Sequence, residues 1–407
     1  MARDASDAIT EDLVVEIATD LLRFPSTLGE EGPVGEALAG RMRALGYEVH
    51  VQEVVARRYN VIGIVRGHGG GQNLMLNGHL DVPAVVPGWT RDPYAPLVQD
   101  GWVYGNGVTD MKGGLAAMVA AGAGMIRSGV RLAGDLVVAA VMHHDTTGVG
   151  TKFLLQSLDV RCHLGIVGEP TDLALQLLHS GACHFEVTVT GRAAHVSRRE
   201  DGVDAIRKVI TLLDRIDDQA FTVEKDSRAP YLPRVVVGQI GGGMGAGRTA
   251  PSAWVRGDVR LAPGMSGTTV LRDLQGIIDE CRARDPELQA AARVLFTQTP
   301  YAIDETAPIV QIVRDAHTRV IGRPPRLTTD LPAGAFVTDA SDMMRVGIPT
   351  AVYGPCEWRT VPDERARVAD LLLAARVYAQ SALSVCGTGL ETGEAGTGSS
   401  TAAAATA

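Results

Sequence analysis

The sequence Asn77-Gly78-His79-Leu80-Asp81-Val82-Pro83 follows an apolar run at residues 73–77 that reads as a buried strand. Loops that follow the strands of an open α/β sheet are where such sheets bind ligands. A neutral imidazole at His79 suits a divalent metal, and Asp81 could accept the other ring N–H and fix the tautomer. A single His in such a place is more often structural, so the interpretation depends on further ligands.

Two more polar motifs follow the same pattern. Asp110 lies in the glycine-rich stretch 104–114 in front of an apolar helical segment, and Glu169 directly follows an apolar strand at 163–167. Taken alone, Asp110 could cap the helix and Glu169 could face solvent. Together with His79 they place a His, an Asp and a Glu near strand ends, which predicts a metal site of the hard-to-borderline type.

Strand-like and helix-like segments alternate along most of the chain, which predicts an α/β fold with a mixed sheet flanked by helices. The run Leu136 to Met142 is continuous and apolar, as expected of a strand buried on both faces. The main predicted strands are 47–55, 60–66, 73–77, 135–142, 163–167 and 349–353, and the main predicted helices are 10–23, 31–46, 113–128, 148–157, 307–321 and 363–384.

The order of elements changes near residue 181. Residues 181–297 read strand-helix-strand-strand-helix-strand, which is typical of a small ferredoxin-like α+β domain. We therefore predict a discontinuous domain at 1–180 and 298–386, with this second domain inserted in it. The Gly-, Ser-, Thr- and Ala-rich stretch 387–407 is predicted to be a disordered tail.

The composition narrows the class of protein. The 407 residues include 38 Lys and Arg against 47 Asp and Glu, for a net charge of -9, so nucleic-acid binding is not expected. The 5 Cys form no C-x-x-C pair, which favours a reducing compartment. The charged N-terminal segment does not resemble a signal peptide, and the apolar run near 114–126 reads as a buried helix. We expect a cytoplasmic protein that does not bind membranes.

The motifs together resemble the zinc aminoacylase/carboxypeptidase family, which includes acetylornithine deacetylase, succinyl-diaminopimelate desuccinylase and glutamate carboxypeptidase. The resemblance covers roughly residues 10–385. It implies a zinc-exopeptidase-like catalytic domain, an inserted lid and dimerisation domain, a homodimer, and bound Zn²⁺, with Co²⁺ or Mn²⁺ as alternatives. The matching residues are His79, Asp81, Pro83, Trp89, Asp92-Pro93-Tyr94, Tyr104-Gly105 and Asp110 to Gly114.

By this resemblance His79 and Glu169 bind a first metal, Asp110 bridges two metals, and Asp81 orients His79. In the lid, Gly191-Arg192-Ala193-Ala194-His195 matches the family's Gly-x-x-x-His. The resemblance implies that His195 reaches a substrate carbonyl oxygen, in the site of a partner subunit, and stabilises an oxyanion.

A second lid residue is carried over in the same way. Asp258-Val259-Arg260 matches the family's strand that bears an Arg. The resemblance implies that Arg260 grips a substrate carboxylate with paired N–H groups. The alternative is an ion pair on the surface of the lid.

The chain departs from the family where the catalytic base is expected. The family's Asp-Glu-Glu becomes His143-His144-Asp145, with Gly150-Thr151 setting the register. His144 thus replaces the general base, and Asp145 replaces a ligand of the second metal with a shorter arm. A neutral His144 is a competent base, and either His143 or His144 could instead become a metal ligand.

A second departure removes a ligand. The family's C-terminal Ala-His-x-Pro-Asp-Glu is represented by residues 359–364, in which Thr360 takes the place of the His. The last His of the chain is His317, so no His can be shifted into this position. A hydroxyl is a poor zinc ligand, and Cys356 is the nearby substitute. One metal site is therefore expected, and the second is in doubt.

Three functions remain open from the sequence. The first is a divergent metallohydrolase that cleaves the amide of an N-acyl amino acid or small peptide. The second is a repurposed enzyme in which weak activation of water favours amide formation, acyl transfer or cyclisation. The third is a non-catalytic binding protein that keeps the cleft.

Overall fold

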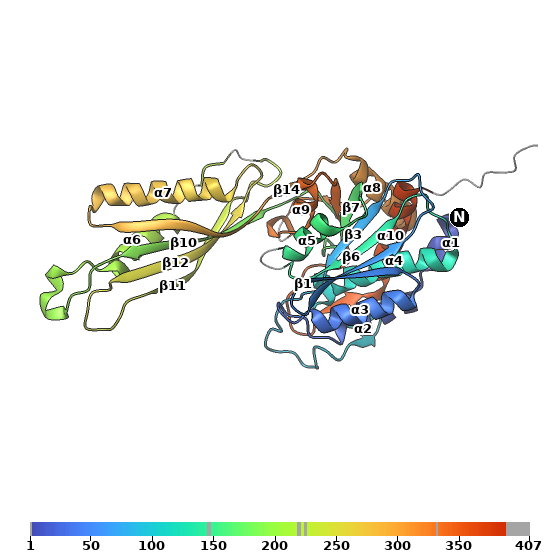
Figure 1. Ribbon diagram of the computed structural model, residues 1–407, viewed down its shortest axis with the longest axis horizontal. Helices are drawn as coiled ribbons and strands as arrows, with labels where there is room; N and C mark the ends of the chain where they lie inside the picture. Colours follow the sequence, from blue (N-terminus) through green and yellow to red (C-terminus); the bar gives the residue numbers. More distant parts are fainter. Residues whose placement is uncertain (1, 145–147, 218–220, 224–225, 331–332, 388–407) are drawn as a thin grey trace, which may run out of the picture.

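A computed structural model describes residues 2–144, 148–217, 221–223, 226–330 and 333–387. Asp145 and all but the first residue of the predicted tail lie outside these ranges. The described chain forms a main α/β domain and a lid that projects from it, as the sequence predicts (Figure 1). Each part has its own cluster of buried apolar side chains.

The main sheet has eight strands in the order β1-β2-β6-β3-β7-β16-β8-β15. The central strands β6, β3, β7 and β16 run parallel, whereas β1, β2 and β6 are antiparallel neighbours. Every residue of β3, β6 and β7 is buried, which explains the apolar sequences of β6, β7 and the first half of β3. The strands are β1 (Glu48–Val55), β2 (Arg58–Val65), β3 (Leu74–His79), β6 (Leu136–Val141), β7 (Leu164–Val167), β8 (Leu175–Gln176), β15 (Leu327–Thr328) and β16 (Thr350–Val352).

Helices cover this sheet. Helices α3 and α4 contact β2, α4 also contacts β3 and β6, and α5 and α9 contact other strands of the sheet. Helix α10 is long and apolar enough to span a membrane, but 67% of its 18-residue apolar stretch is buried within the protein, where it packs against α4 and α8. The helices of this domain are α1 (Ala2–Asp7), α2 (Glu11–Leu22), α3 (Gly32–Ala44), α4 (Gly113–Ser128), α5 (Val149–Ser157), α8 (Pro308–Ile321), α9 (Ala340–Arg345) and α10 (Val368–Cys386), with short turns η1 (Val108–Lys112) and η3 (Ala333–Ala335).

The predicted helix at 363–384 begins later than expected. Residues Arg365–Arg367 form the short strand β17, which pairs with β5 (Trp102–Tyr104), and β5 in turn pairs with β4 (Leu97–Gln99). This pairing uses backbone N–H and C=O groups that a helix would need, so α10 starts only at Val368.

Glycines bring α4 close to the end of β7. A Cβ on Gly114 would lie 2.3 Å from the carbonyl oxygen of Gly168, so a larger residue would push the helix away. This contact sets Asp110, just before α4, beside Glu169, just after β7. The paired glycines of the 104–114 motif therefore position the site.

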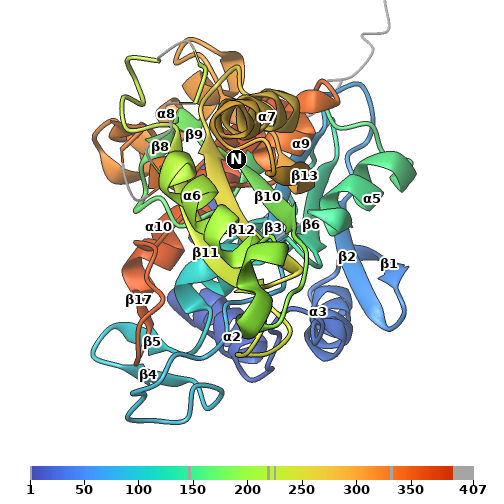
Figure 2. The ribbon, with the colours of Figure 1, turned by 90° about the vertical axis from the view of Figure 1, so that its left-hand side faces the viewer.

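The lid is a four-stranded antiparallel sheet in the order β11-β12-β10-β13. Helices α6 and α7 contribute to the same apolar cluster as this sheet and lie alongside it in Figure 2. On the edge strand β11, Val236 and Ile240 are 59% and 55% exposed. The elements are β10 (Gly181–Thr190), η2 (Val196–Asp201), α6 (Ala205–Asp217), β11 (Arg234–Gly242), β12 (Ser252–Leu261), α7 (Gly267–Arg284) and β13 (Gln289–Gln298). The predicted fold class is confirmed.

The lid joins the main domain through a short ladder and side-chain contacts. Strand β9 (Leu178–His179) pairs with β14 (Tyr301–Ala302), just outside the lid sheet. The Gln298 side chain donates to the Thr338 carbonyl, and Tyr231 donates to the Thr329 carbonyl. These contacts tie the base of the lid to the main domain.

Candidate metal centre

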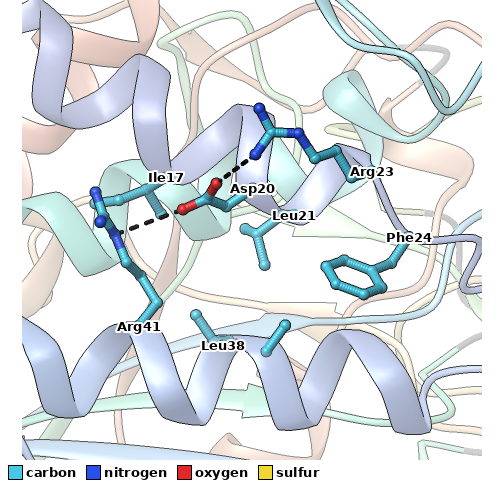
Figure 3. A pocket seen from close by; sticks show the side chains of 8 residues that line it. Ile17, Asp20, Leu21, Arg23, Phe24, Leu38 and Arg41 are labelled. Atoms are coloured by element: carbon cyan, nitrogen blue, oxygen red, sulfur yellow. Dashed lines mark hydrogen bonds and ion pairs between the residues drawn. The ribbon is translucent and has the colours of Figure 1, made fainter.

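Three of the four predicted metal ligands, His79, Asp110 and Glu169, line one cavity of about 270 Å³. It opens where β3 and β7 end and where Arg260 reaches over from the lid. A separate cavity of about 250 Å³ lies between α2 and α3, where Asp20 pairs with Arg23 and Arg41 over apolar side chains (Figure 3). The two cavities share no lining residue. Of the two, only the cavity at the ends of β3 and β7 is lined by His, Asp and Glu side chains from several elements.

His79, Asp110 and Glu169 converge as the sequence predicts. His79 is the last residue of β3, and its Nε2 lies 3.1 Å from Asp110 Oδ1 and 3.7 Å from Glu169 Oε1. The side chain of Asp110 does not cap α4, which has no side-chain cap hydrogen bond. Glu169 is buried rather than facing solvent. Both structural alternatives raised by the sequence are therefore excluded.

Asp81 holds His79 through its main chain. His79 Nδ1 lies 2.7 Å from the Asp81 carbonyl oxygen and 3.9 Å from its carboxylate. The carboxylate instead accepts the backbone N–H of His144 at 3.0 Å. The prediction that the Asp81 side chain orients His79 is thus corrected: the carbonyl orients the ring, because the tight turn after β3 brings it closer, and the carboxylate places the loop of His144.

His144 stands beside the predicted ligands. Its ring stacks on that of His79, with ring centres 4.6 Å apart and planes at 11°. Its Nε2 is 3.8 Å from Glu169 Oε1, and its Nδ1 is 3.0 Å from Asp339 Oδ1. The other oxygen of Asp339 accepts the hydroxyl of Thr151 at 2.8 Å. Asp339 is therefore held on one side and directs Nε2 of His144 toward the cavity.

The sequence interpretation missed Asp339. Its position directly before α9 is typical of a helix cap, yet its side chain makes no cap hydrogen bond. Asp339 is 1% exposed, and its carboxylate points to His144 and Thr151 instead. A buried Asp in a capping position that leaves the helix uncapped is recognisable only once the fold is known.

The cavity stabilises positive charge. Burial lowers the pKa of His79, but the charge of Glu169 and the hydrogen bond with Asp110 outweigh it and hold the pKa well above its ordinary value. Burial also lowers the pKa of His144, while Asp339 opposes it strongly enough to raise the pKa to about 9. The pKa of Asp110 is lowered because its contact with His79 outweighs burial. The carboxylates thus favour a cation where the two ring Nε2 atoms meet Glu169.

The donor set fits a divalent cation. Ligand atoms of His79, His144 and Glu169 lie within 4.8 Å of one another. Atoms about 2.0–2.2 Å from a tetrahedral Zn²⁺ are about 3.3–3.6 Å apart, close to the 3.7 Å between His79 and Glu169. Glu169 Oε1 is buried and has no hydrogen-bond partner among the described residues. An orphaned carboxylate oxygen of this kind is costly unless a cation satisfies it.

The side of the cavity where the family resemblance implies a second metal has no comparable set of ligands among the described residues. Asp110 Oδ2 accepts the indole N–H of Trp358 at 3.0 Å. Thr360 lines the cavity, but Cys356 does not. The Cys356 thiol lies 3.8 Å from the Val108 carbonyl oxygen, and burial raises its pKa well above the ordinary value. The structure therefore does not bring Cys356 to the site, and Asp145 lies outside the described residues.

The two lid residues are placed differently. Arg260 lines the cavity, with Nε 2.8 Å from Asp258 and Nη1 3.1 Å from the Ala335 carbonyl oxygen. It therefore makes the ion pair of the structural alternative and also faces the site. His195 is exposed at the start of η2 and accepts the backbone N–H of Ser197. It is not among the residues that line the cavity of its own chain.

Comparisons with known proteins agree with this geometry. Residues 75–384 match the model of "Peptidase family M20/M25/M40". The acetylornithine deacetylase of Salmonella typhi is 30% identical over 376 residues, which cover 86% of this chain and 92% of that protein. Aminopeptidase PepT of Bacillus cereus has a similar structure, with a TM-score of 0.74, 18% identity, and coverage of 93% of this chain and 99% of that one.

A second structural neighbour is the YXEP protein of Bacillus subtilis, described as a dinuclear metal-binding peptidase of the M20 family. It gives a TM-score of 0.70 at 13% identity, with 92% of this chain and 98% of that one covered. The chain therefore belongs to peptidase family M20/M25/M40, a family of metal-dependent hydrolases that act on amide bonds.

Proposed function

We propose that this protein hydrolyses the amide bond of an N-acyl amino acid or small peptide that carries a free carboxylate. A divalent cation would be held by His79, Glu169 and Asp110. Zn²⁺ is the ion we expect, and Co²⁺ or Mn²⁺ would also suit these ligands. The observation that carries the proposal is the buried Glu169 oxygen without a hydrogen-bond partner, beside two imidazoles held by carboxylates.

When bound, the cation supplies a Lewis acid for the amide carbonyl and lowers the pKa of water. His144 then acts as the base. Its Nε2 takes a proton from the attacking water and passes it to the leaving nitrogen. Asp339 is a positioning residue, because its hydrogen bond to Nδ1 sets the tautomer that leaves a lone pair on Nε2. His144 Nε2 lies 3.8 Å from Glu169, so its lone pair would stay available once a cation is held by that carboxylate, because like charges disfavour the imidazolium.

Arg260 and an aromatic wall support the choice of substrate. The guanidinium of Arg260 lines the cavity and can bind a carboxylate. The rings of Phe336 and Trp358 are 4.9 Å apart and line the same space. A cavity of about 270 Å³ suits a small molecule rather than a folded protein.

We further propose that the enzyme is a cytoplasmic homodimer. An exposed His195 on the lid is suited to reach the site of a partner subunit and stabilise an oxyanion there, which requires a homodimer. The exposed apolar side chains of Val236 and Ile240 on the edge strand β11 suit such a contact. All 5 cysteines are buried free thiols, which supports a cytoplasmic location.

One experiment separates the roles that His144 could play. His144→Ala is expected to keep its metal, measured by elemental analysis, and to lose about 10²–10⁴-fold in kcat on a panel of N-acyl amino acids, as for removal of a general base. His50→Ala, at an exposed histidine of β1, is the matched control. If His144→Ala also loses the metal, His144 is a ligand rather than the base, as the clustering of its Nε2 with His79 and Glu169 would allow.

The same panel tests the proposed reaction. Substrate pairs are scored for condensation as well as for hydrolysis. A metal-free protein with full turnover would reject the proposal. Condensation products with little hydrolysis would favour the repurposed enzyme considered from the sequence.

A further inference from the structure

The two oxygens of the Asp110 carboxylate have different partners. Oδ1 faces His79 Nε2 at 3.1 Å, on the side of Glu169. Oδ2 accepts the indole N–H of Trp358 at 3.0 Å. In a dinuclear centre a bridging carboxylate gives one oxygen to each ion. Here a neutral donor, Trp358, occupies the oxygen that would serve the second ion.

The loop that carries the indole is bonded to other segments on both sides of Trp358 in the chain. The Cys356 carbonyl accepts the N–H of Asp172 at 2.7 Å, and the Arg359 carbonyl accepts the hydroxyl of Thr109 at 3.1 Å. Thr109 precedes Asp110, so the loop that carries Trp358 is bonded to the segment that carries its acceptor. The ring also packs on Phe336 at 4.9 Å. The contact with Asp110 is therefore built into the fold.

Among the residues that the structure describes, which do not include Asp145, the remaining groups on that side do not replace the missing ligands. Thr360 offers a neutral hydroxyl, which is a poor ligand for zinc. The Cys356 thiol is turned to the Val108 carbonyl and does not line the cavity. Within the described ranges, the one cluster with metal-ligand spacing is His79, His144 and Glu169.

The two other carboxylates near the cluster already have partners within the protein. Asp339 contacts His144 Nδ1 and accepts the hydroxyl of Thr151, and Asp81 accepts the backbone N–H of His144.

We propose that this centre binds one divalent cation, and that the indole N–H of Trp358 takes the place of the second ion on Asp110. The residues thus fit one metal and do not fit the dinuclear arrangement described for the Bacillus subtilis neighbour. The inference rests on the proposed function, because it requires an ion at His79 and Glu169.

The test is metal stoichiometry on the full-length protein. The chain is stripped with a chelator and titrated with Zn²⁺ by calorimetry and elemental analysis, and with Mn²⁺ by electron paramagnetic resonance. One ion per chain and uncoupled Mn²⁺ spectra are expected. Two tightly bound ions or spin-coupled Mn²⁺ pairs would overturn the inference while leaving the proposed hydrolase intact. A chain that binds no ion would overturn both.

Variants test the role of the indole directly. Thr360→His restores a second-site ligand but leaves Trp358 on Asp110, so it is expected to stay at one ion per chain. The double variant Trp358→Phe/Thr360→His frees Oδ2 and is expected to gain a second ion. Trp254→Phe/Thr360→His, which alters a lid tryptophan stacked under Arg256, is the matched control and should stay at one. A second ion in Thr360→His alone, or none gained in the double variant, would contradict the role given to Trp358.

Discussion

The main sheet and the lid sheet hold their functional residues in different ways. Strand β3 is buried along its whole length, whereas the burial of β11 alternates and exposes much of one face. Residues at the end of β3 and just after β7 therefore sit on a framework packed from both sides, and His79 and Glu169 meet within 3.7 Å. The positions of lid residues relative to the cavity depend on the orientation of the lid on the main domain.

This difference explains the contrast between the two lid residues. Arg260 lies near the base of the lid, where its Nη1 bonds the Ala335 carbonyl of the main domain. His195 lies beyond that contact and is exposed to solvent. The main domain alone thus brings the candidate metal ligands together, whereas the substrate contacts proposed for the lid would depend on the junction and, for His195, on the proposed second subunit. Three further substitutions test this contrast between the two domains.

The largest expected effect is in the main domain. Glu169→Gln replaces the buried carboxylate by a neutral amide, which is a weaker ligand for a divalent cation. Loss of the metal's contribution of several kcal/mol should lower kcat/KM by about 10³-fold or more. Metal content and steady-state rates measure this, with the exposed Glu357→Gln as control. Normal metal content and rate in Glu169→Gln would mean that the ion binds elsewhere.

The next effect concerns the junction. His179, in the ladder between the domains, is fully buried beside Thr338, and burial lowers its pKa to about 4. Above about pH 6.5 it is neutral in both folded and unfolded chains. As the pH falls from about 6.5 to about 4, the unfolded chain binds a proton that the folded chain does not, so up to about 3 kcal/mol of stability is lost.

Urea unfolding at pH 7.5, 5.5 and 4.5 measures this loss in the wild type and in His179→Gln. The variant should lose less stability between pH 7.5 and 4.5 than the wild type. Equal pH slopes in the two proteins would show that His179 does not stay neutral in the folded junction.

The smallest effect is expected at the lid. Arg260→Ala removes a hydrogen-bonding charge from the substrate and should raise KM by about 10–100-fold, the equivalent of about 1.5–3 kcal/mol. The metal content should stay unchanged, since the guanidinium bonds to Asp258 and to the Ala335 carbonyl rather than to His79, Asp110 or Glu169. Arg256→Ala, on the same strand but paired with Glu186, is the control. A loss of metal in Arg260→Ala would contradict the view that the main domain binds the metal independently of the lid.

Much of the site was predictable because its residues stand at ends of apolar segments. His79 and Glu169 follow apolar runs, whose composition predicts buried strands. The glycines after Asp110 predict that helix α4 packs closely against a neighbouring backbone segment. The start of α10 was predicted too early because the pairing of β17 with β5 joins segments far apart in the chain. Local pattern carries no information about such a partner.

The sequence alone predicted the family fold and three candidate metal ligands and showed that no His follows His317, because each depends on which residue stands at a motif position. Only the tertiary structure showed what occupies the altered positions. Asp339 meets His144 across 195 residues, and Trp358 meets Asp110 across 248. Contacts over such separations arise from the packing of the whole domain, so the second oxygen of Asp110 could be assigned to an indole rather than to a metal only in three dimensions.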